Sequence, residues 1–211
     1  QAAELLKIPK EKIKCIGASQ FEIYKIKSSF SRSKLIKKFN VPVSERYILY
    51  AGVGESFRET KYLKFLNNAI ENNYLTNCHV IYRPHPWRGS LQDEEENFFD
   101  LNLKHISMDP HMINYYKKQL KNPSKTFFMV DYKITRDLLT LVNGVMSPRS
   151  TILLEGILLG KKPFVIFPEE DNNLIFSRDN IHFKSFCQLP NVTTCFKIEQ
   201  FYTKIKQYNK I

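Results

Sequence analysis

Four short apolar segments constrain the fold of this chain more than any other feature of its sequence. Strands that alternate apolar and polar residues keep one face in water, whereas continuously apolar strands are buried on both faces. These four segments are apolar at nearly every position, and stretches with helical spacing separate them. The pattern therefore predicts an α/β fold, with a doubly wound parallel sheet covered by helices on both sides. The predicted buried strands lie at 47–51, 78–83, 144–146 and 163–167.

The remaining elements are predicted from apolar spacing, capping residues and stop signals. Ser31 and Asp131 precede helical stretches as N-cap residues, and Gly160 follows one as a stop signal. Helices are expected at 31–40, 58–72, 110–119, 133–142 and 151–159, short strands at 104–108 and 127–130, and a loop at 18–30.

Composition limits the class of protein and its partners. The chain has 32 Lys and Arg against 21 Asp and Glu, and the net charge of +11 favours nucleic acid, a phosphorylated ligand or an acidic lipid surface. No apolar run approaches the roughly 18 residues that a membrane-spanning helix needs. The four cysteines form no CxxC pair, so we expect no zinc site, and reduced thiols are typical of a cytoplasmic protein.

The 211 residues are expected to form a single nucleotide-binding α/β domain. The chain does not begin with Met, and its first residues resemble the middle of a longer protein. We therefore expect a domain whose N-terminal half is missing. Within it we expect a lead-in at 1–12, an irregular insertion at 88–126 and a terminal basic helix at 197–211.

Two clusters of possible ligand-binding residues follow predicted strands, where ligands of parallel sheets bind. Gly52 and Gly54 come after the first strand, and amides in such a turn can hold an anion, although the same pattern is as often only a tight turn. Arg83 and His85 end the next strand, with His85 held between two prolines. This position suits a phosphate contact or general acid–base catalysis, which we favour over an ordinary loop histidine.

A third cluster follows the predicted strand at 144–146. Its members are Ser147, Arg149, Ser150 and Thr151, and the last two begin a predicted helix, where hydroxyls and unpaired amides suit a diphosphate. Glu155 lies one helical turn further on and faces the same way as Thr151. A carboxylate among leucines needs a partner, which ribose hydroxyls would supply. The alternative is a capped core helix with one exposed glutamate.

In this order, the clusters resemble the C-terminal, nucleotide-binding domain of GT-B fold glycosyltransferases that make surface or capsular polysaccharides. The chain is similar to CDP-glycerol glycerophosphotransferases and to non-hydrolysing nucleotide-sugar epimerases. The resemblance implies a Rossmann-like sheet that forms one half of a GT-B fold. The segments that carry it are 12–24, 47–52, 80–86 and 130–167.

The resemblance also implies roles for particular residues. Phosphate contacts fall on His85, Ser150 and Thr151, with His85 as the catalytic candidate, and the ribose contact falls on Glu155. The base would meet the backbone of Met129, Val130 and Asp131. No cofactor and no metal are implied, because the nucleotide-activated donor is a substrate.

One departure bears on the donor. The glycerophosphotransferases carry Thr-Asp-Tyr-Ser-Ser where this chain has Met146 to Ser150, which favours a sugar donor over CDP-glycerol. The expected acceptor is a polysaccharide or a lipid-linked precursor, and the expected location is cytoplasmic, with peripheral contact to an anionic membrane. Two other functions remain open: a nucleotide-sugar epimerase, and a non-enzymatic basic module that binds RNA or another anionic polymer. No specific nucleic acid is expected, because no aromatic and basic RNA-binding motif is visible.

Overall fold

A six-stranded, all-parallel sheet forms the centre of the computed structural model. Its strand order is β3-β2-β1-β4-β5-β6, the order of a Rossmann-like, doubly wound fold. The strands are β1 Arg46–Ala51, β2 Cys78–Arg83, β3 Ile106–Met108, β4 Gly144–Ser147, β5 Lys162–Ile166 and β6 Thr193–Cys195. The structure describes residues 7, 9–12, 14, 18–53, 58–86, 96–121, 128, 131–148, 150–167 and 185–210.

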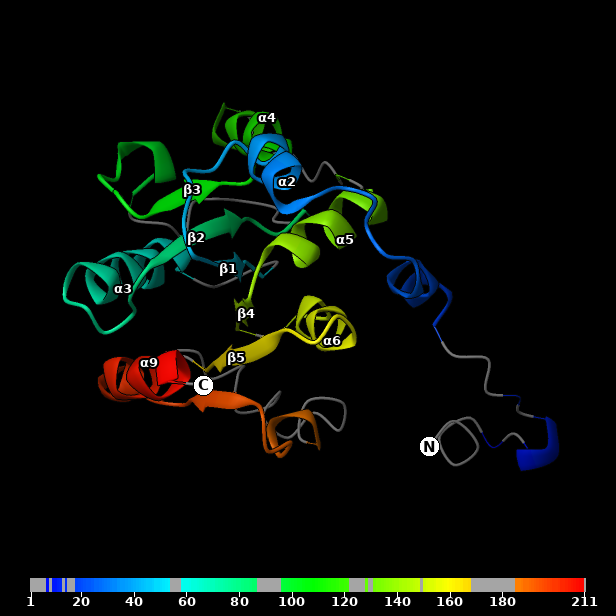
Figure 1. Cartoon of the computed structure of the whole chain (residues 1–211). Coiled ribbons are helices and arrows are strands. Elements are labelled where there is room, and N and C mark those ends of the chain that lie inside the picture. Colours follow the sequence, from blue (N-terminus) through cyan, green and yellow to red (C-terminus); the bar gives the residue numbers. More distant parts are fainter. Residues whose placement is uncertain are drawn as a thin grey trace.

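Helices cover both faces of this sheet (Figure 1). The α-helices are α2 Arg32–Lys38, α3 Glu59–Glu71, α4 Pro110–Lys121, α5 Tyr132–Leu141, α6 Ile152–Leu158 and α9 Phe201–Lys210. Short 3₁₀ helices are η1 Lys10–Lys12, η2 Ser19–Lys25, η3 Phe98–Asp100 and η4 Ile198–Gln200. Among the described residues, no helix is both long and apolar enough to cross a membrane.

Two apolar cores lie on opposite faces of the sheet, because successive residues of a strand point to opposite sides. In β1, Ile48 and Tyr50 pack into the core that contains α3 and α9. Tyr47 and Leu49 pack into the other core, with α2, α5, α6 and η2. The continuously apolar strands therefore supply both cores, as the sequence predicts.

Local signals explain where several helices begin and end. The Ser31 hydroxyl accepts a hydrogen bond from the backbone of Lys34 and caps α2. Asp131 caps α5 in the same way, through the amide of Lys133 at 2.8 Å. Gly160 follows α6 with φ of +70°, a left-handed conformation that favours glycine.

Most of the predicted elements are confirmed, but the structure differs from the expectations in several places. The predicted loop at 18–30 contains η2, and Lys38 at the end of α2 is half-buried and pairs with Asp137 at 2.6 Å. β6 was not expected, because its Thr-Thr-Cys sequence lacks an apolar run. Residues 96–121, inside the segment expected to be irregular, form η3, β3 and α4. The strand expected at 127–130 lies outside the described residues except for Phe128.

Candidate functional site

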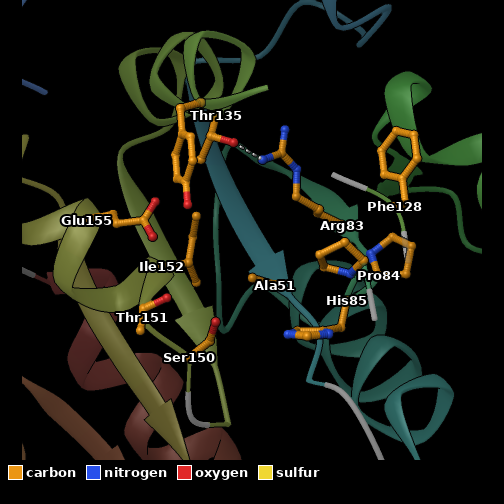
Figure 2. A pocket seen from close by; sticks show the side chains of 13 residues that line it. Ala51, Arg83, Pro84, His85, Phe128, Thr135, Ser150, Thr151, Ile152 and Glu155 are labelled. Atoms are coloured by element: carbon orange, nitrogen blue, oxygen red, sulfur yellow. Dashed lines mark hydrogen bonds between the residues drawn. The ribbon is translucent and has the colours of Figure 1, made fainter. Parts of the chain in front are cut away.

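A pocket of about 390 Å³ opens at the carboxyl edge of the sheet, between the ends of β1 and β2 and the start of α6. Its two walls face each other across the end of β1 (Figure 2). Arg83, Pro84, His85 and Phe128 form one wall, and Ser150, Thr151, Ile152 and Glu155 form the other. The full lining is Ala51, Gly52, Arg83, Pro84, His85, Pro86, Phe128, Tyr132, Thr135, Ser150, Thr151, Ile152 and Glu155.

Arg83 is the last residue of β2, and its side chain is fixed at two points. Its Nε donates to Oδ2 of Asp109 at 2.6 Å, and its Nη1 donates to the hydroxyl of Thr135 at 3.0 Å. The guanidinium is buried, and its Nη2 has no hydrogen-bond partner among the described residues. Burial alone would raise the pKa of Asp109, but Arg83 and the hydrogen bonds from His111 outweigh burial and hold that pKa below its usual value. The pair is therefore ionic, with one donor of Arg83 unused.

His85 lies on the same wall, in the chain that leaves β2. It is half-exposed and follows the buried Pro84. The next residue, Pro86, accepts a hydrogen bond from the amide of Phe128 at 3.2 Å. The ring of Phe128 stacks on Tyr115 of α4, with centroids 5.4 Å apart. This wall thus presents an imidazole beside a supported aromatic face, a surface on which a planar ring can stack.

The opposite wall begins after β4. Ser150 is half-buried and Thr151 is exposed, and both line the pocket just before α6, as the sequence predicts. Glu155 follows on α6 and also lines the pocket, but it is 93% buried, since only 7% of its surface is exposed. Its Oε2 accepts a hydrogen bond from the hydroxyl of Tyr24, and Thr151 also bonds to its carboxylate. The alternative of an exposed glutamate is therefore wrong, because Glu155 is buried and has Tyr24 as a partner within the chain, and the ribose contact stays a prediction.

The ionisation of Glu155 reflects these surroundings. Burial raises its pKa above the usual value, while the hydrogen bonds from Tyr24 and Thr151 and the charge of Arg83 act in the opposite direction and only partly compensate. The pKa of Tyr24 is also raised, first by its own burial and then by Glu155. Tyr24 therefore stays protonated and donates.

Gly52 lines the pocket, but its turn differs from the one expected. The amide of Gly52 donates to the carbonyl of Arg83 at 2.9 Å, and the amide of Val53 donates to Oε1 of Glu59 at 2.8 Å. The carboxyl group of the fully buried Glu59 also accepts from the hydroxyl of Tyr82 at 2.5 Å. These two amides are already bonded, so the expectation that they are free for an anion is wrong.

The other predicted residues do not line the pocket in the described part of the chain. Ser147 is fully buried in β4, and its hydroxyl has no hydrogen-bond partner there. Asp131 is exposed and caps α5. Gly54, Met129, Val130 and Arg149 lie outside the described residues. Among the residues that are described, no group of three or more His, Cys, Asp or Glu is arranged to hold a metal ion.

The sequence does not predict the places of Phe128, Tyr132 and Thr135 in the pocket lining, or the contact that Tyr24 makes with Glu155 from outside it. Thr135 and Tyr132 belong to a helix that was predicted, but no local signal tells which of its residues face a ligand. Tyr24 meets Glu155 across 131 positions of sequence, so only the fold brings them together.

No protein-family model and no curated protein matches the chain. Among solved structures, it matches the wall teichoic acid polymerase TagF, in a structure soaked with CDPG, with a TM-score of 0.50 and 12% identity. The match covers 96% of this chain and 42% of TagF. A second match is KpsC of Thermosulfurimonas dismutans, a β-Kdo 2,4 transferase, with a TM-score of 0.32, 14% identity and coverage of 72% of this chain and 46% of that one. The chain thus spans less than half the length of the proteins it resembles. The predicted fold, a Rossmann-like parallel sheet like one half of a GT-B enzyme, is confirmed.

Proposed function

We propose that this chain is the donor-binding half of a transferase, which moves a sugar or a polyol phosphate from a nucleotide-activated donor to a surface polysaccharide acceptor. The observation that carries the proposal is the pocket at the carboxyl edge, where His85, Ser150, Thr151 and Glu155 line one cavity. The pocket extends from the ends of β1 and β2 to the turn after β4, so it includes the point between β1 and β4 where the strand order reverses, and ligands of doubly wound sheets bind at that point.

The two walls together offer groups that suit each part of such a donor. The imidazole of His85 and the hydroxyls of Ser150 and Thr151 suit the phosphates, and the ring of Phe128 suits the base. The carboxylate of Glu155 suits the ribose hydroxyls, which donate charge-assisted hydrogen bonds. The reaction is displacement of the nucleotide from the donor by an acceptor hydroxyl. His85 would stabilise the departing phosphates as their charge develops.

The net charge of +11 is consistent with a polyanionic donor and with peripheral contact to anionic lipids. The acceptor and its catalytic base would lie mainly on the other half of such an enzyme. An epimerase reaction would need further acidic groups in the cleft, and among the described residues that line the pocket Glu155 is the only acidic one, which favours transfer.

Nucleotide binding tests this proposal directly. CDP, UDP and GDP are titrated into the chain at low salt and followed by calorimetry and by NMR; CDP is included because the TagF structure was soaked with CDPG. We expect weak binding of at least one nucleotide, with shifts of residues that line the pocket. Shifts confined to the basic helix α9, or no binding of any nucleotide, would contradict the proposal.

The role of His85 is tested in the same assay. We expect His85→Ala to weaken nucleoside diphosphate binding by about 1.5–3 kcal/mol, the scale of a hydrogen bond to a charged group. The matched control is His105→Ala, because His105 lies before β3, at the opposite edge of the sheet. Wild-type affinity in the His85 variant would make this histidine an ordinary loop residue.

A further inference from the structure

The segment that leads into the domain supplies one side chain to the pocket. Tyr24 lies on η2, which packs against α5 and α6. Its ring belongs to the apolar core on that face, and its hydroxyl reaches the carboxylate of Glu155. Only 7% of Tyr24 is exposed. The contact is therefore a buried hydrogen bond that joins the entering chain to a residue of the pocket wall.

Glu155 keeps accepting capacity after this bond. A carboxylate offers about four lone-pair sites. Tyr24 occupies one on Oε2, and Thr151 also bonds to the carboxylate. Since Glu155 lines the pocket (Figure 2), its remaining lone pairs are available to hydroxyl donors that enter there. Arg83 acts on it only through its charge.

A flexible glutamate side chain would lose rotamer freedom when it binds a ligand, and this loss costs free energy. A buried donor within the chain that already holds the side chain removes that cost before the ligand arrives. The Tyr24 hydroxyl stays protonated, so it donates constantly and holds one oxygen of the carboxylate in place. The other lone pairs are then oriented before a ligand arrives. A carboxylate held in place in this way discriminates more strongly between ligands that carry hydroxyls at the right positions and ligands that lack them.

We infer that Tyr24 is a positioning residue for recognition of a vicinal diol in the pocket: it fixes Glu155, and Glu155 accepts hydrogen bonds from the two hydroxyls of a ribose. This inference rests on the proposed function and deepens it, because it assigns part of the pocket's specificity to the segment before the first strand. Tyr24 itself does not line the pocket.

The test compares the affinity of each nucleotide with that of its 2′-deoxy form. The two ligands carry the same phosphates and differ only in the 2′-hydroxyl, so the ratio of their affinities measures the contribution of that hydroxyl. CDP, UDP and GDP and their 2′-deoxy forms are titrated into the wild type, Tyr24→Phe and Glu155→Gln. In the wild type we expect the ribose form to bind about tenfold more tightly, the scale of one hydrogen bond to a charged group. In both variants the ratio should fall toward one.

Two further variants separate positioning from general damage. Tyr24→Leu lacks both ring and hydroxyl and should give the same low ratio as Tyr24→Phe, provided that its circular dichroism is that of the wild type. Tyr202→Phe is the matched control, because Tyr202 lies on α9 and loses a hydrogen bond with Asn68 away from the pocket. Its ratio should equal that of the wild type.

The outcomes distinguish this inference from the function on which it rests. If no nucleotide binds the wild type, the proposed function fails and this inference fails with it. If nucleotides bind but the wild-type ratio is near one, or if Tyr24→Phe keeps the wild-type ratio, the donor pocket stands and the role of Tyr24 is overturned.

Discussion

Two turns at the carboxyl edge of the sheet, where the pocket opens, connect a central strand to a helix, and they use their polar groups in opposite ways. In the turn after β1, the amides of Gly52 and Val53 are bonded within the domain, to Arg83 and to Glu59. In the turn after β4, Ser150 and Thr151 line the pocket. From the sequence both turns are candidates for anion binding. The difference is the buried Glu59, whose carboxyl group already binds an amide of the first turn. The second turn instead faces the pocket, where a ligand can bind.

The backbone amides of Gly52 and Val53 in the first turn are already paired within the domain. A glycine-rich turn binds an anion only when its amides are not already paired. A carboxyl group at the start of the following helix is a competing acceptor, and Glu59 is the first residue of α3. Substitutions in the first turn should therefore change stability, whereas substitutions in the second should change binding.

The largest effect is expected for Glu59→Ala. It removes the acceptor of the Val53 amide and of the Tyr82 hydroxyl and leaves a cavity, at a position with no exposed surface. We expect the free energy of unfolding to fall by about 3–5 kcal/mol, since each buried donor without an acceptor costs about 1–3 kcal/mol. Urea unfolding measures this loss. Glu71→Ala, at the exposed end of the same helix, is the control, and equal losses in both variants would contradict the role given to Glu59.

Gly52→Ala should have the next largest effect. A Cβ at position 52 would collide with the carboxylate of Glu59 and lie 2.6 Å from its Cδ. We expect a loss of about 2 kcal/mol in unfolding free energy, typical of overpacking a well-filled site. A double-mutant cycle sharpens the test, because the collision disappears in a Glu59→Ala background. Additive losses would show that Gly52 is required for another reason.

The sequence predicts the parts of the molecule that depend on local pattern. Continuously apolar runs identify β1, β2, β4 and β5, while β6 is missed because Thr193 and Thr194 carry no apolar signal and its pairing with β5 is purely tertiary. In the candidate site, His85, Ser150 and Thr151 line one pocket, and their positions follow from a strand end and a helix start that are visible in sequence, while their roles stay predictions. Tyr24 and Glu59 are not found, because each acts through a contact that only the folded chain creates.

Ser150→Ala tests the second turn and should leave stability within about 0.5 kcal/mol of the wild type, since Ser150 is only half-buried. Nucleoside diphosphate binding should weaken by about 1.5 kcal/mol, the lower end of the scale for a hydrogen bond to a charged group. Calorimetry and urea unfolding on the same samples measure the two quantities. Thr203→Ala, on the exposed face of α9, is the control for binding. If Ser150→Ala lowers stability without lowering affinity, the second turn has a structural role like the first, and the distinction between the two turns is wrong.

The last prediction concerns the pH dependence that Glu155 gives to the stability of the fold. Its pKa in the folded chain is raised above the usual value of 4.5, mainly by burial, so the folded state retains a proton that the unfolded state has already lost. Stability from this group is therefore fully present below pH 4.5 and is lost as the pH rises through the higher pKa of the folded state.

Glu155→Gln isolates this dependence, because Asp109 and every other titrating group are common to both proteins. We expect the difference in unfolding free energy, wild type minus variant, to decrease with rising pH by about 1.4 kcal/mol for each unit by which the pKa is raised. Urea unfolding over a series of pH values from below 4.5 to neutrality measures it. A flat difference would mean that Tyr24, Thr151 and Arg83 together balance the effect of burial, and a difference that increases with pH would mean that they stabilise the carboxylate more than burial disfavours it. In either case Glu155 would carry its charge above its usual pKa of 4.5 and could accept charge-assisted hydrogen bonds from ligand hydroxyls.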